Sequence, residues 1–323
     1  ALREGISLAN LEFTSIHPLT VADTSLRLPL DLLGSGGVVI GADGQPMSME
    51  DGPDALARAI IDAGGASLDL TSIPRTATTW FAGVAENLQS RCGIDCSQTL
   101  IPLMPMANVT IGGIPTDAIG QVVKGGWDST VKGLFAAGDA ACSGLHGASL
   151  NSGDHLLGAI ASGELAGNAA ANQAASSKFS GSSQISIALT EAHHLHDSML
   201  SSAGAEGVSA GTIQSTLATT MQTHMGTSRN AGGLTQAAAS ISQLQETTIS
   251  LSDSSPVMNT ELVTLLRTQS LLSVASAAVS AATAREESRG NHVRSDFPTT
   301  DTEPPSHSLT SMDGTVTSLP LRS

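Results

Sequence analysis

The segment Gly133-Leu134-Phe135-Ala136-Ala137-Gly138-Asp139 decides how the fold of this chain is interpreted. An apolar run bounded by glycines predicts a buried strand, here Val131 to Ala137, and it ends in an acid. A short loop follows, and then a helix with Asp154 as its N-cap. Strand, loop and helix in this order are the repeating unit of a dinucleotide-binding sheet, whose ligands lie beyond the carboxyl ends of the strands.

Gly138 and Asp139 are therefore candidate cofactor-binding residues. A carboxylate at the end of a strand can accept hydrogen bonds from a ribityl or ribose hydroxyl, and a helix N-terminus directs free N–H groups at a cofactor. In a flavin, that helix end suits the negative charge of the N1/C2 carbonyl region in the reduced ring. An ordinary strand–loop–helix unit explains the same pattern. Because no G-x-G-x-x-G occurs in the sequence, any phosphate-binding turn must come from elsewhere.

The helix that starts at Asp154 carries an unusual set of glycines. Leu156, Leu157, Ile160 and Ala161 recur at one-turn spacing, which is typical of a helix. Along the same helix lie Gly158, Gly163 and Gly167. A glycine inside a helix costs about 1 kcal/mol relative to alanine. We therefore expect close backbone packing at these positions.

Composition excludes several classes of protein. The 323 residues hold 14 basic and 29 acidic side chains, for a net charge of −15, which argues against a nucleic-acid or anionic-membrane binder. With five Phe, two Trp and no Tyr, a base-stacking surface is not expected. The sequence contains no uninterrupted run of eighteen apolar residues, so it predicts no membrane-spanning helix. Three cysteines (Cys92, Cys96 and Cys142) form neither a disulfide framework nor a closed zinc site, which favours structural roles and a reducing compartment.

The rest of the chain divides into segments of different pattern. The first residues read as the middle of an amphipathic helix with no signal peptide before it, so the sequence is expected to begin inside a longer protein. We predict a strand over 11–16 that is closed by His17-Pro18, a helix over 53–63 and a strand over 66–70. The Ser/Ala/Gly-rich stretch over 172–188 is predicted to be a linker, and the region over 189–286 is predicted to be helical with breaks near 202–211 and 251–258. This helical region carries an apolar stripe of Leu262, Leu265, Leu266 and Leu272, and a polar tail follows Gly290.

Several motifs, in order along the chain, resemble the flavoprotein subunit of succinate dehydrogenase and fumarate reductase without its amino-terminal flavin-binding third. Leu11 to Pro18 resembles the family's E-F-x-Q-F-H-P-T, and Ile111 to Thr116 resembles M-G-G-I-P-T. Gly133 to Cys142 resembles G-L-Y-A-A-G-E-A-A-C and is followed by His146-Gly147-Ala148. Near the end, Arg285 to His292 resembles R-E-E-S-R-G-A-H, and Phe297-Pro298 and Ser306-His307-Ser308-Leu309 continue in register.

The resemblance implies a fold of mixed α+β and α/β class. It would contain part of a two-dinucleotide-binding-type flavin domain, a capping α+β domain and a carboxyl-terminal helical domain. The implied boundaries are 1–19 for the end of the amino-terminal flavin portion, 20–104 for the capping domain, 105–172 for the return of the flavin domain, 173–290 for the helical domain and 291–323 for the tail.

The resemblance also implies a reaction and partners. A hydride would pass between succinate, a dicarboxylate, and N5 of FAD, with electrons going on to an iron–sulfur subunit because these cysteines cannot build clusters. Membrane anchor subunits would hold the assembly at the cytoplasmic or mitochondrial-matrix side of a membrane. L-aspartate oxidase belongs to the same superfamily, and Ala9 to Phe13 resembles it too.

Carried over by position, the resemblance makes His17 a catalytic-site residue that contacts substrate and makes Asp139, Gly138 and Leu156 cofactor-binding. Asp139 stands where the family has Glu, and His155 replaces the Ser before Leu156. Three substrate-binding or proton-transferring positions differ in charge: Asn108 replaces His, and Leu150 and Pro53 replace Arg. Each lost charged contact to a buried carboxylate costs roughly 2–5 kcal/mol. A catalytically impaired scaffold subunit and an aspartate oxidase-like flavoprotein therefore remain alternatives to the succinate enzyme.

The remaining candidates have simpler explanations. His193 with His196 or Asp197 on one helical face could ligate a metal, although a solvated helix face is the commoner origin of such a cluster, and we assign no metal. His224 and His292 are expected to be structural, and Arg289 and Arg294 to serve helix packing or docking. Ser143 lacks the G-x-S-x-G frame of a hydrolase.

Overall fold

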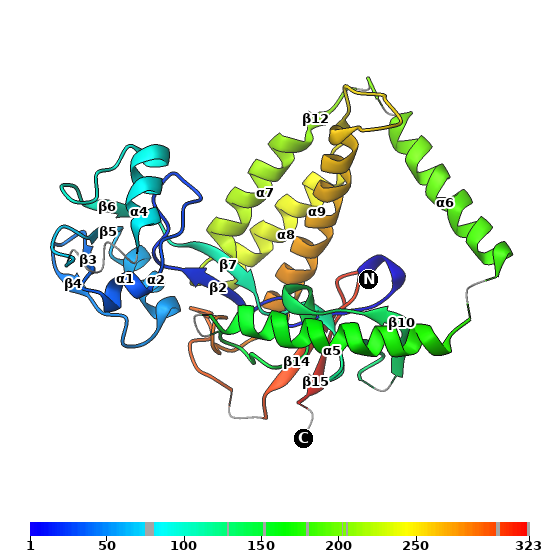
Figure 1. Ribbon diagram of the computed structural model, residues 1–323, viewed down its shortest axis with the longest axis horizontal. Helices are drawn as coiled ribbons and strands as arrows, with labels where there is room; N and C mark the ends of the chain where they lie inside the picture. Colours follow the sequence, from blue (N-terminus) through cyan, green and yellow to red (C-terminus); the bar gives the residue numbers. More distant parts are fainter. Residues whose placement is uncertain are drawn as a thin grey trace.

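The computed structural model describes residues 1–74, 81–127, 129–150, 153–178, 181–201, 203–204, 206–301 and 304–321. A small α+β lobe, a helical bundle and a central body of short sheets crossed by one long helix make up the structure (Figure 1). The mixed α/β class is that predicted from the sequence.

The small lobe is built on a four-stranded antiparallel sheet in the order β4-β3-β5-β6. Its strands are β3 (Val38–Gly41), β4 (Pro46–Met47), β5 (Ala66–Asp69) and β6 (Ile101–Leu103), and its helices are α1 (Asp31–Gly34), α2 (Pro53–Asp62), α4 (Ala82–Asn87) and η2 (Leu88–Cys92). Leu56 and Ile60 of α2 pack against Leu68 of β5 in its core. The predicted helix over 53–63 and strand over 66–70 are thereby confirmed to within a residue.

The central body joins distant parts of the sequence. β1 (Leu8–Ala9) pairs with the hairpin of β14 (Ser306–Thr310) and β15 (Val316–Pro320), so the two ends of the chain share one sheet. The other pairs are β2 (Thr14–His17) with β7 (Met106–Thr110), β8 (Ile114–Pro115) with β11 (Ala141–Cys142), and β9 (Gln121–Lys124) with β10 (Ser129–Phe135); η1 (Leu2–Glu4), η3 (Gly138–Ala140) and α5 (Asp154–Ser176) complete the body.

The bundle packs three long helices around the predicted leucine stripe. Its elements are α7 (Ala210–His224), α8 (Ala231–Glu246), α9 (Thr260–Ala284) and the strand pair β12 (Val208–Ser209) with β13 (Ile249–Ser250). The helix α6 (Ser182–Leu200) comes before them in the chain, has no fully buried residue and stands apart from the three helices (Figure 1). α9 is long and apolar enough to cross a membrane. It is nevertheless the central helix of the bundle, where Leu262, Leu265 and Leu272 are buried against α7 and α8.

Several predicted elements are wrong in detail. The strand around Leu134 is β10, which pairs antiparallel with β9 and has only exposed and half-buried residues, although α5 lies beside it and Gln173 accepts from the Gly133 N–H at 3.1 Å. Asp154 is the first residue of α5 and Gly153 is the N-cap. The strand predicted over 11–16 is β2 and starts at Thr14, and the amino-terminal helix is one 3-10 turn. The polar tail contributes the hairpin β14–β15.

The predicted linker over 172–188 is also wrong. Residues 172–176 continue α5 and 182–188 begin α6, since alanine and serine in this stretch are compatible with a helix. Residues 179 and 180 of that linker lie outside the described residues, as do 202 and 205 of the predicted break near 202–211.

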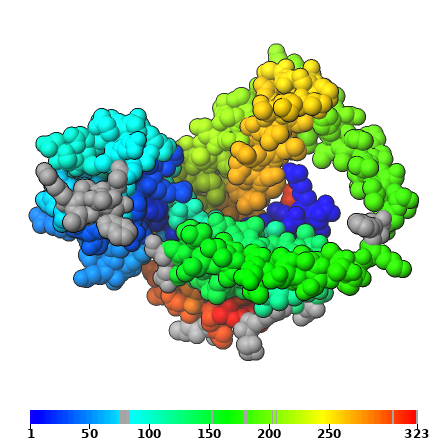
Figure 2. Space-filling view, in the orientation of Figure 1, coloured from blue at the N-terminus to red at the C-terminus, as the bar shows by residue number. Residues whose placement is uncertain are grey.

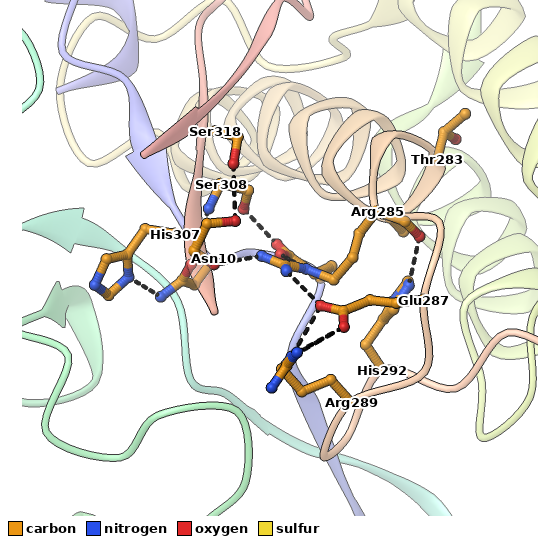
Figure 3. A network of polar contacts seen from close by, with 12 residues as sticks. Asn10, Thr283, Arg285, Glu287, Arg289, His292, His307, Ser308 and Ser318 are labelled. Carbon is orange, nitrogen blue, oxygen red and sulfur yellow. Dashed lines mark hydrogen bonds and ion pairs between the residues drawn. The ribbon is translucent and has the colours of Figure 1, made fainter. Parts of the chain in front are cut away.

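A buried polar network ties the body to the bundle (Figure 3). Glu12 is fully buried and accepts hydrogen bonds from Arg285 Nε at 2.7 Å and from the Ser308 hydroxyl at 2.7 Å. Arg285 also donates to Glu287 at 2.9 Å, and Glu287 is paired with Arg289 at 2.8 Å. Arg285 follows the end of α9 and Ser308 lies in β14, so the pair joins helix, hairpin and the segment before β2.

A second buried cation stands behind this network. Arg229 Nη1 donates to the Glu12 carbonyl at 2.6 Å and to His292 Nδ1 at 2.9 Å. His292 Nε2 then donates to the Arg285 carbonyl at 3.1 Å, so the ring is neutral. Burial, reinforced by the charge of Arg229, lowers the pKa of His292 to about 3. The expectation that His292 and Arg294 are structural agrees with these contacts and with the pair that Arg294 forms with Asp296 at 2.8 Å.

Replacing Glu12 should test how far the fold depends on this network. Glu12→Ala leaves Arg285 with one carboxylate partner, Glu287, and removes the carboxylate that accepts the Ser308 hydroxyl hydrogen bond. Removing one member of a buried ion pair typically lowers the free energy of unfolding by about 3–5 kcal/mol. We expect a loss of that size in urea unfolding. The control Glu4→Ala, at an exposed position, should change stability little. A loss below about 1 kcal/mol for Glu12→Ala would contradict the role given to the network.

Buried His292 makes stability depend on pH. Its pKa is about 3 in the folded chain against 6.5 in the unfolded chain, so its contribution is complete above pH 6.5 and is lost as the pH falls toward 3. The slope from this one group is up to about 1.4 kcal/mol per pH unit. In unfolding titrations from pH 7.5 to 4, His292→Gln should flatten the curve, whereas His193→Gln, exposed on α6, should leave its slope unchanged. Parallel curves for the parent and His292→Gln would refute the assignment.

Candidate functional site

A cavity of about 430 Å³ lies between the β7–β9 region, the loop after η3 and one face of α5. Volumes of roughly 300–1,000 Å³ are typical of small-molecule sites. Its polar lining residues are Thr110, Thr116, Asp117, Asp139, Cys142, Ser143, His146, His155 and Ser162. Two of the predicted cofactor-binding residues, Gly138 and Asp139, therefore line one cavity.

Glycine and serine hold η3 against α5. Gly138 has φ of +61°, and a Cβ there would approach Ala159 of α5 to 3.3 Å. Its N–H donates to the Ser162 hydroxyl at 3.0 Å, and that hydroxyl donates in turn to the Gly158 carbonyl at 2.6 Å. These contacts fix the loop so that Asp139 stands at the cavity edge. Its carboxylate is exposed, and no hydrogen bond within the described residues engages it.

Close packing was predicted at three glycines of α5; it is present at Gly158, whereas a Cβ at Gly163 or Gly167 would meet no described heavy atom within 4 Å. A Cβ at Gly158 would lie 3.0 Å from His146 Nε2, so the absence of a side chain there makes room for the imidazole that lines the cavity. Leu156, two residues earlier, points elsewhere: its side chain is 61% exposed and is not among the lining residues. Contact between flavin and the Leu156 backbone stays a prediction.

His17 lies outside the cavity, in β2 opposite Met106 of β7. Burial, together with the charge of Arg27, lowers its pKa to about 4. The adjacent Ile16 N–H donates to Asp54 at 2.7 Å, and burial raises the pKa of that carboxyl. The structure therefore places the predicted substrate histidine beside Asp54 of the small lobe and apart from Asp139.

Positions 53, 108 and 150, where the resemblance places Arg, His and Arg, hold uncharged side chains in this chain. Leu150 is buried against Phe13 and Ile111, Asn108 is half-buried in β7, and Pro53 opens α2. No Lys or Arg occurs among the described residues that line the cavity, whereas Asp117 and Asp139 are acidic. A dicarboxylate is best held by cationic donors in bidentate geometry. The arrangement does not supply them.

The residues present fit the ring and ribityl end of a flavin. Asp139 offers a carboxylate to hydroxyl groups, the glycine-lined loop allows close backbone approach, and His155 brings the first turn of α5 to the cavity. The sequence holds no glycine-rich phosphate-binding turn, so the diphosphate end has no corresponding motif in this chain.

Sequence reasoning missed several lining residues. Asp117 was not singled out; its carboxylate accepts from the Ile119 and Gln121 N–H groups at 3.0 and 2.9 Å and so shapes the turn that lines the cavity. Aspartate at the first position of a turn, in Asp117-Ala118-Ile119-Gly120, is the signal that could have found it. Ser162 gave no such signal, because its role depends on a contact 24 residues away in sequence.

Of the other candidates, the α6 histidines and the two cysteines of the small lobe are not among the residues that line the cavity, whereas Cys142 and Ser143 are. His196 Nδ1 is 3.2 Å from Asp197 on α6, and no group of three possible metal ligands occurs in the part of the chain that the structure describes. Cys142 is buried, and burial raises its pKa to about 11. Cys92 and Cys96 are half-buried free thiols that pack against the core of the small lobe.

Comparison with known proteins agrees with this arrangement. Residues 1–156 match an FAD binding domain family, and residues 214–320 match the family described as fumarate reductase flavoprotein C-term. The chain is 30% identical to the succinate dehydrogenase flavoprotein subunit of Rickettsia bellii over 97% of its length and 56% of that relative. It is 31% identical to the fumarate reductase flavoprotein subunit of Mycobacterium tuberculosis, covering 94% of this chain and 57% of the relative.

A solved structure shows the same fold. An E. coli quinol fumarate reductase variant superposes with a TM-score of 0.88 at 25% identity, covering 98% of this chain and 60% of that one. The chain thus spans a little over half the length of the relatives it matches. Its motifs, its fold and both halves of its sequence identify it as a member of the succinate dehydrogenase and fumarate reductase flavoprotein family, whose cofactor is FAD.

Proposed function

We propose that this chain forms the ring-contacting, capping and helical parts of an FAD-dependent flavoprotein, with Asp139, Gly138 and the first turn of α5 facing the isoalloxazine and ribityl groups. The observation that carries the proposal is the glycine-lined cavity between η3 and α5, with the exposed carboxylate of Asp139 at its edge. FAD supplies hydride and electron transfer in this family when it is bound. The residues of this chain would orient the ring and exclude water from one side of it.

The residues at the substrate positions support an electron-transfer or scaffold role over efficient succinate oxidation. Leu150, Asn108 and Pro53, which stand where the resemblance places substrate-binding or proton-transferring residues, carry no charge that could pair with a dicarboxylate. At roughly 2–5 kcal/mol for each missing charged contact, two missing donors lower kcat/KM by several orders of magnitude. Hydride transfer between succinate and FAD N5 is therefore the second candidate, favoured by the retained His17 and by the names of the relatives.

Partners follow from the same proposal. With three cysteines, none of them clustered, the chain cannot hold an iron–sulfur centre of its own. Electrons from the flavin would pass to an iron–sulfur subunit, held with membrane anchor subunits at the cytoplasmic or matrix side of a membrane. An aspartate oxidase-like activity would need no such partner, and reduction of the flavin by aspartate distinguishes it.

Flavin binding tests the assignment of Asp139. The chain is coexpressed with the amino-terminal portion of the Mycobacterium tuberculosis relative, and FAD affinity is measured by fluorescence quenching. Asp139→Ala should weaken FAD binding about tenfold or more, since a hydrogen bond to a charged group contributes roughly 1.5–3 kcal/mol. The control Glu164→Ala, outside the cavity lining, should bind as the parent does. If Asp139→Ala and the parent bound FAD with equal affinity, the result would contradict the proposal.

Anaerobic bleaching of the bound flavin tests the impaired chemistry. Succinate should reduce the flavin at least a thousandfold more slowly than it reduces that of the complete relative, because the cationic donors are missing. Dithionite serves as the control that the flavin is reducible. If succinate reduced the bound flavin as fast as it reduces the flavin of the relative, the second candidate function, hydride transfer between succinate and FAD N5, would be established instead.

A further inference from the structure

A second cavity, of about 390 Å³, lies next to the cavity between η3 and α5. Pro115 of β8 lines the second cavity and Thr116 lines the first, and successive residues of an extended strand point to opposite faces. The amino-terminal segment, the turn between β9 and β10 and the β14–β15 hairpin supply the other walls. Figure 2 shows part of this hairpin, in red, at the surface below α5. Among the described residues none lines both cavities, so the second cavity is a separate site.

Most of the lining of this second cavity is apolar. It includes Pro115, Val123, Trp127, Leu309 and Leu319. Gly126 adds room because it has no side chain, and a Cβ there would lie 3.5 Å from Leu319. The volume is within the range of roughly 300–1,000 Å³ that is typical of small-molecule sites. The cavity therefore suits the hydrocarbon or ring portion of a small molecule.

Trp127 is held as one fixed wall of the cavity. It has φ of +77°, and it follows Gly125 and Gly126, which are also left-handed, with φ of +68° and +79°. This backbone is unfavourable for a bulky side chain and persists only where the surroundings impose it, as they do at many ligand sites. The indole meets the His307 ring edge-on with 5.0 Å between the ring centroids, and Asn10 Nδ2 donates to His307 Nδ1 at 2.7 Å (Figure 3). The aromatic surface is thus in place before a ligand enters.

A single cation stands at the edge of the same cavity. Lys124 is exposed and lines the cavity, and its Nζ would lie 3.8 Å from a Cβ at Gly5. Within the part of the chain that the structure describes, no ion pair engages this ammonium group. The sequence has 29 acidic residues against 14 basic ones, yet no Asp or Glu occurs among the described residues that line the second cavity. Its electrostatic preference is therefore for an anion.

We propose that the second cavity binds an organic monocarboxylate with an apolar body. The carboxylate pairs with Lys124, and the body packs on Trp127, Leu309 and Leu319. A second carboxylate on the ligand would lie against apolar side chains with no cation to meet it, which is strongly unfavourable. The preferred ligand class therefore differs from the dicarboxylate of the relatives' reaction. The inference does not depend on the proposed flavin site, because the two cavities have separate linings.

Tryptophan fluorescence tests this binding site directly. The sequence has two tryptophans, Trp80 and Trp127, so Trp80→Phe leaves Trp127 as the only indole emitter. This chain is titrated with phenylacetate and, separately, with octanoate. We expect a saturable change in Trp127 emission with a dissociation constant of about 1 mM or lower for at least one of them. Tighter binding of phenylacetate assigns an aromatic body to the ligand, and tighter binding of octanoate assigns an aliphatic one.

Removal of the charge tests the role of Lys124. In the Trp80→Phe background, Lys124→Met keeps the aliphatic stem and should weaken carboxylate binding about fivefold or more, because the charge-assisted contact is lost. Lys132→Met, at an exposed lysine that does not line the cavity, should bind as the background chain does. Phenylacetamide has the same ring without the charge, so its affinity should be weaker and should not distinguish Lys124→Met from the background chain.

Folding is checked by the thermal midpoint, which both lysine variants should preserve because both side chains are exposed. The inference would be overturned if neither carboxylate produced a saturable change up to about 10 mM, beyond the weak end of specific binding. Equal carboxylate affinity of Lys124→Met and the background chain would overturn it as well. So would equal affinity of phenylacetate and phenylacetamide, since the cavity would then select for apolar surface alone.

Discussion

The hydrogen-bonded pair of Glu12 and Arg285 is the interaction on which the rest of the structure depends. It brings together three segments separated by up to 296 residues: the stretch before β2, the end of α9 and, through Ser308, the carboxyl-terminal hairpin. Glu12 is completely buried, so each of its partners must be present for the carboxylate to be tolerated. Helical bundle and central body are consequently held in one relative position.

That rigidity has a consequence for the site. β2 follows Glu12 directly and pairs with β7, whose end borders the cavity, and Gly112 and Gly113 let the adjoining backbone pass against Ala9 and Ala140. The loop with Asp139 is in turn fixed to α5 through Ser162. Under the proposed function this scaffold would orient a flavin, while Leu150, Asn108 and Pro53 stand where the resemblance places residues that bind a dicarboxylate or transfer its proton.

Much of this arrangement was predictable from local pattern, and the remainder depended on distant contacts. The α2 helix, the β5 strand and the leucine stripe of α9 follow from periodicity and turn residues. β10 was wrongly predicted to be buried, because an apolar run such as Gly133 to Ala137 has the same composition whether or not another layer covers it. The segment around Ser176 was misread as a linker because alanine and serine are common to linkers and helices.

The same distinction applies to the site. Gly138 and Asp139 were found from the motif they belong to, and the structure brings them to one cavity. Ser162, Asp117 and the role of Gly158 beside His146 depend on how η3 packs against α5, which no local pattern encodes. His17 was grouped with them by resemblance, although the structure places it beside Asp54, outside the cavity.

The central claim is that a flavin occupies the cavity between η3 and α5. Hydrogen–deuterium exchange of the coexpressed complex, recorded with and without FAD, tests it most directly. The account predicts slower exchange on addition of FAD at Gly138 to Ala140 and in the first two turns of α5. Protection confined to the small lobe around β3 and β5, or no protection in this chain, would contradict it.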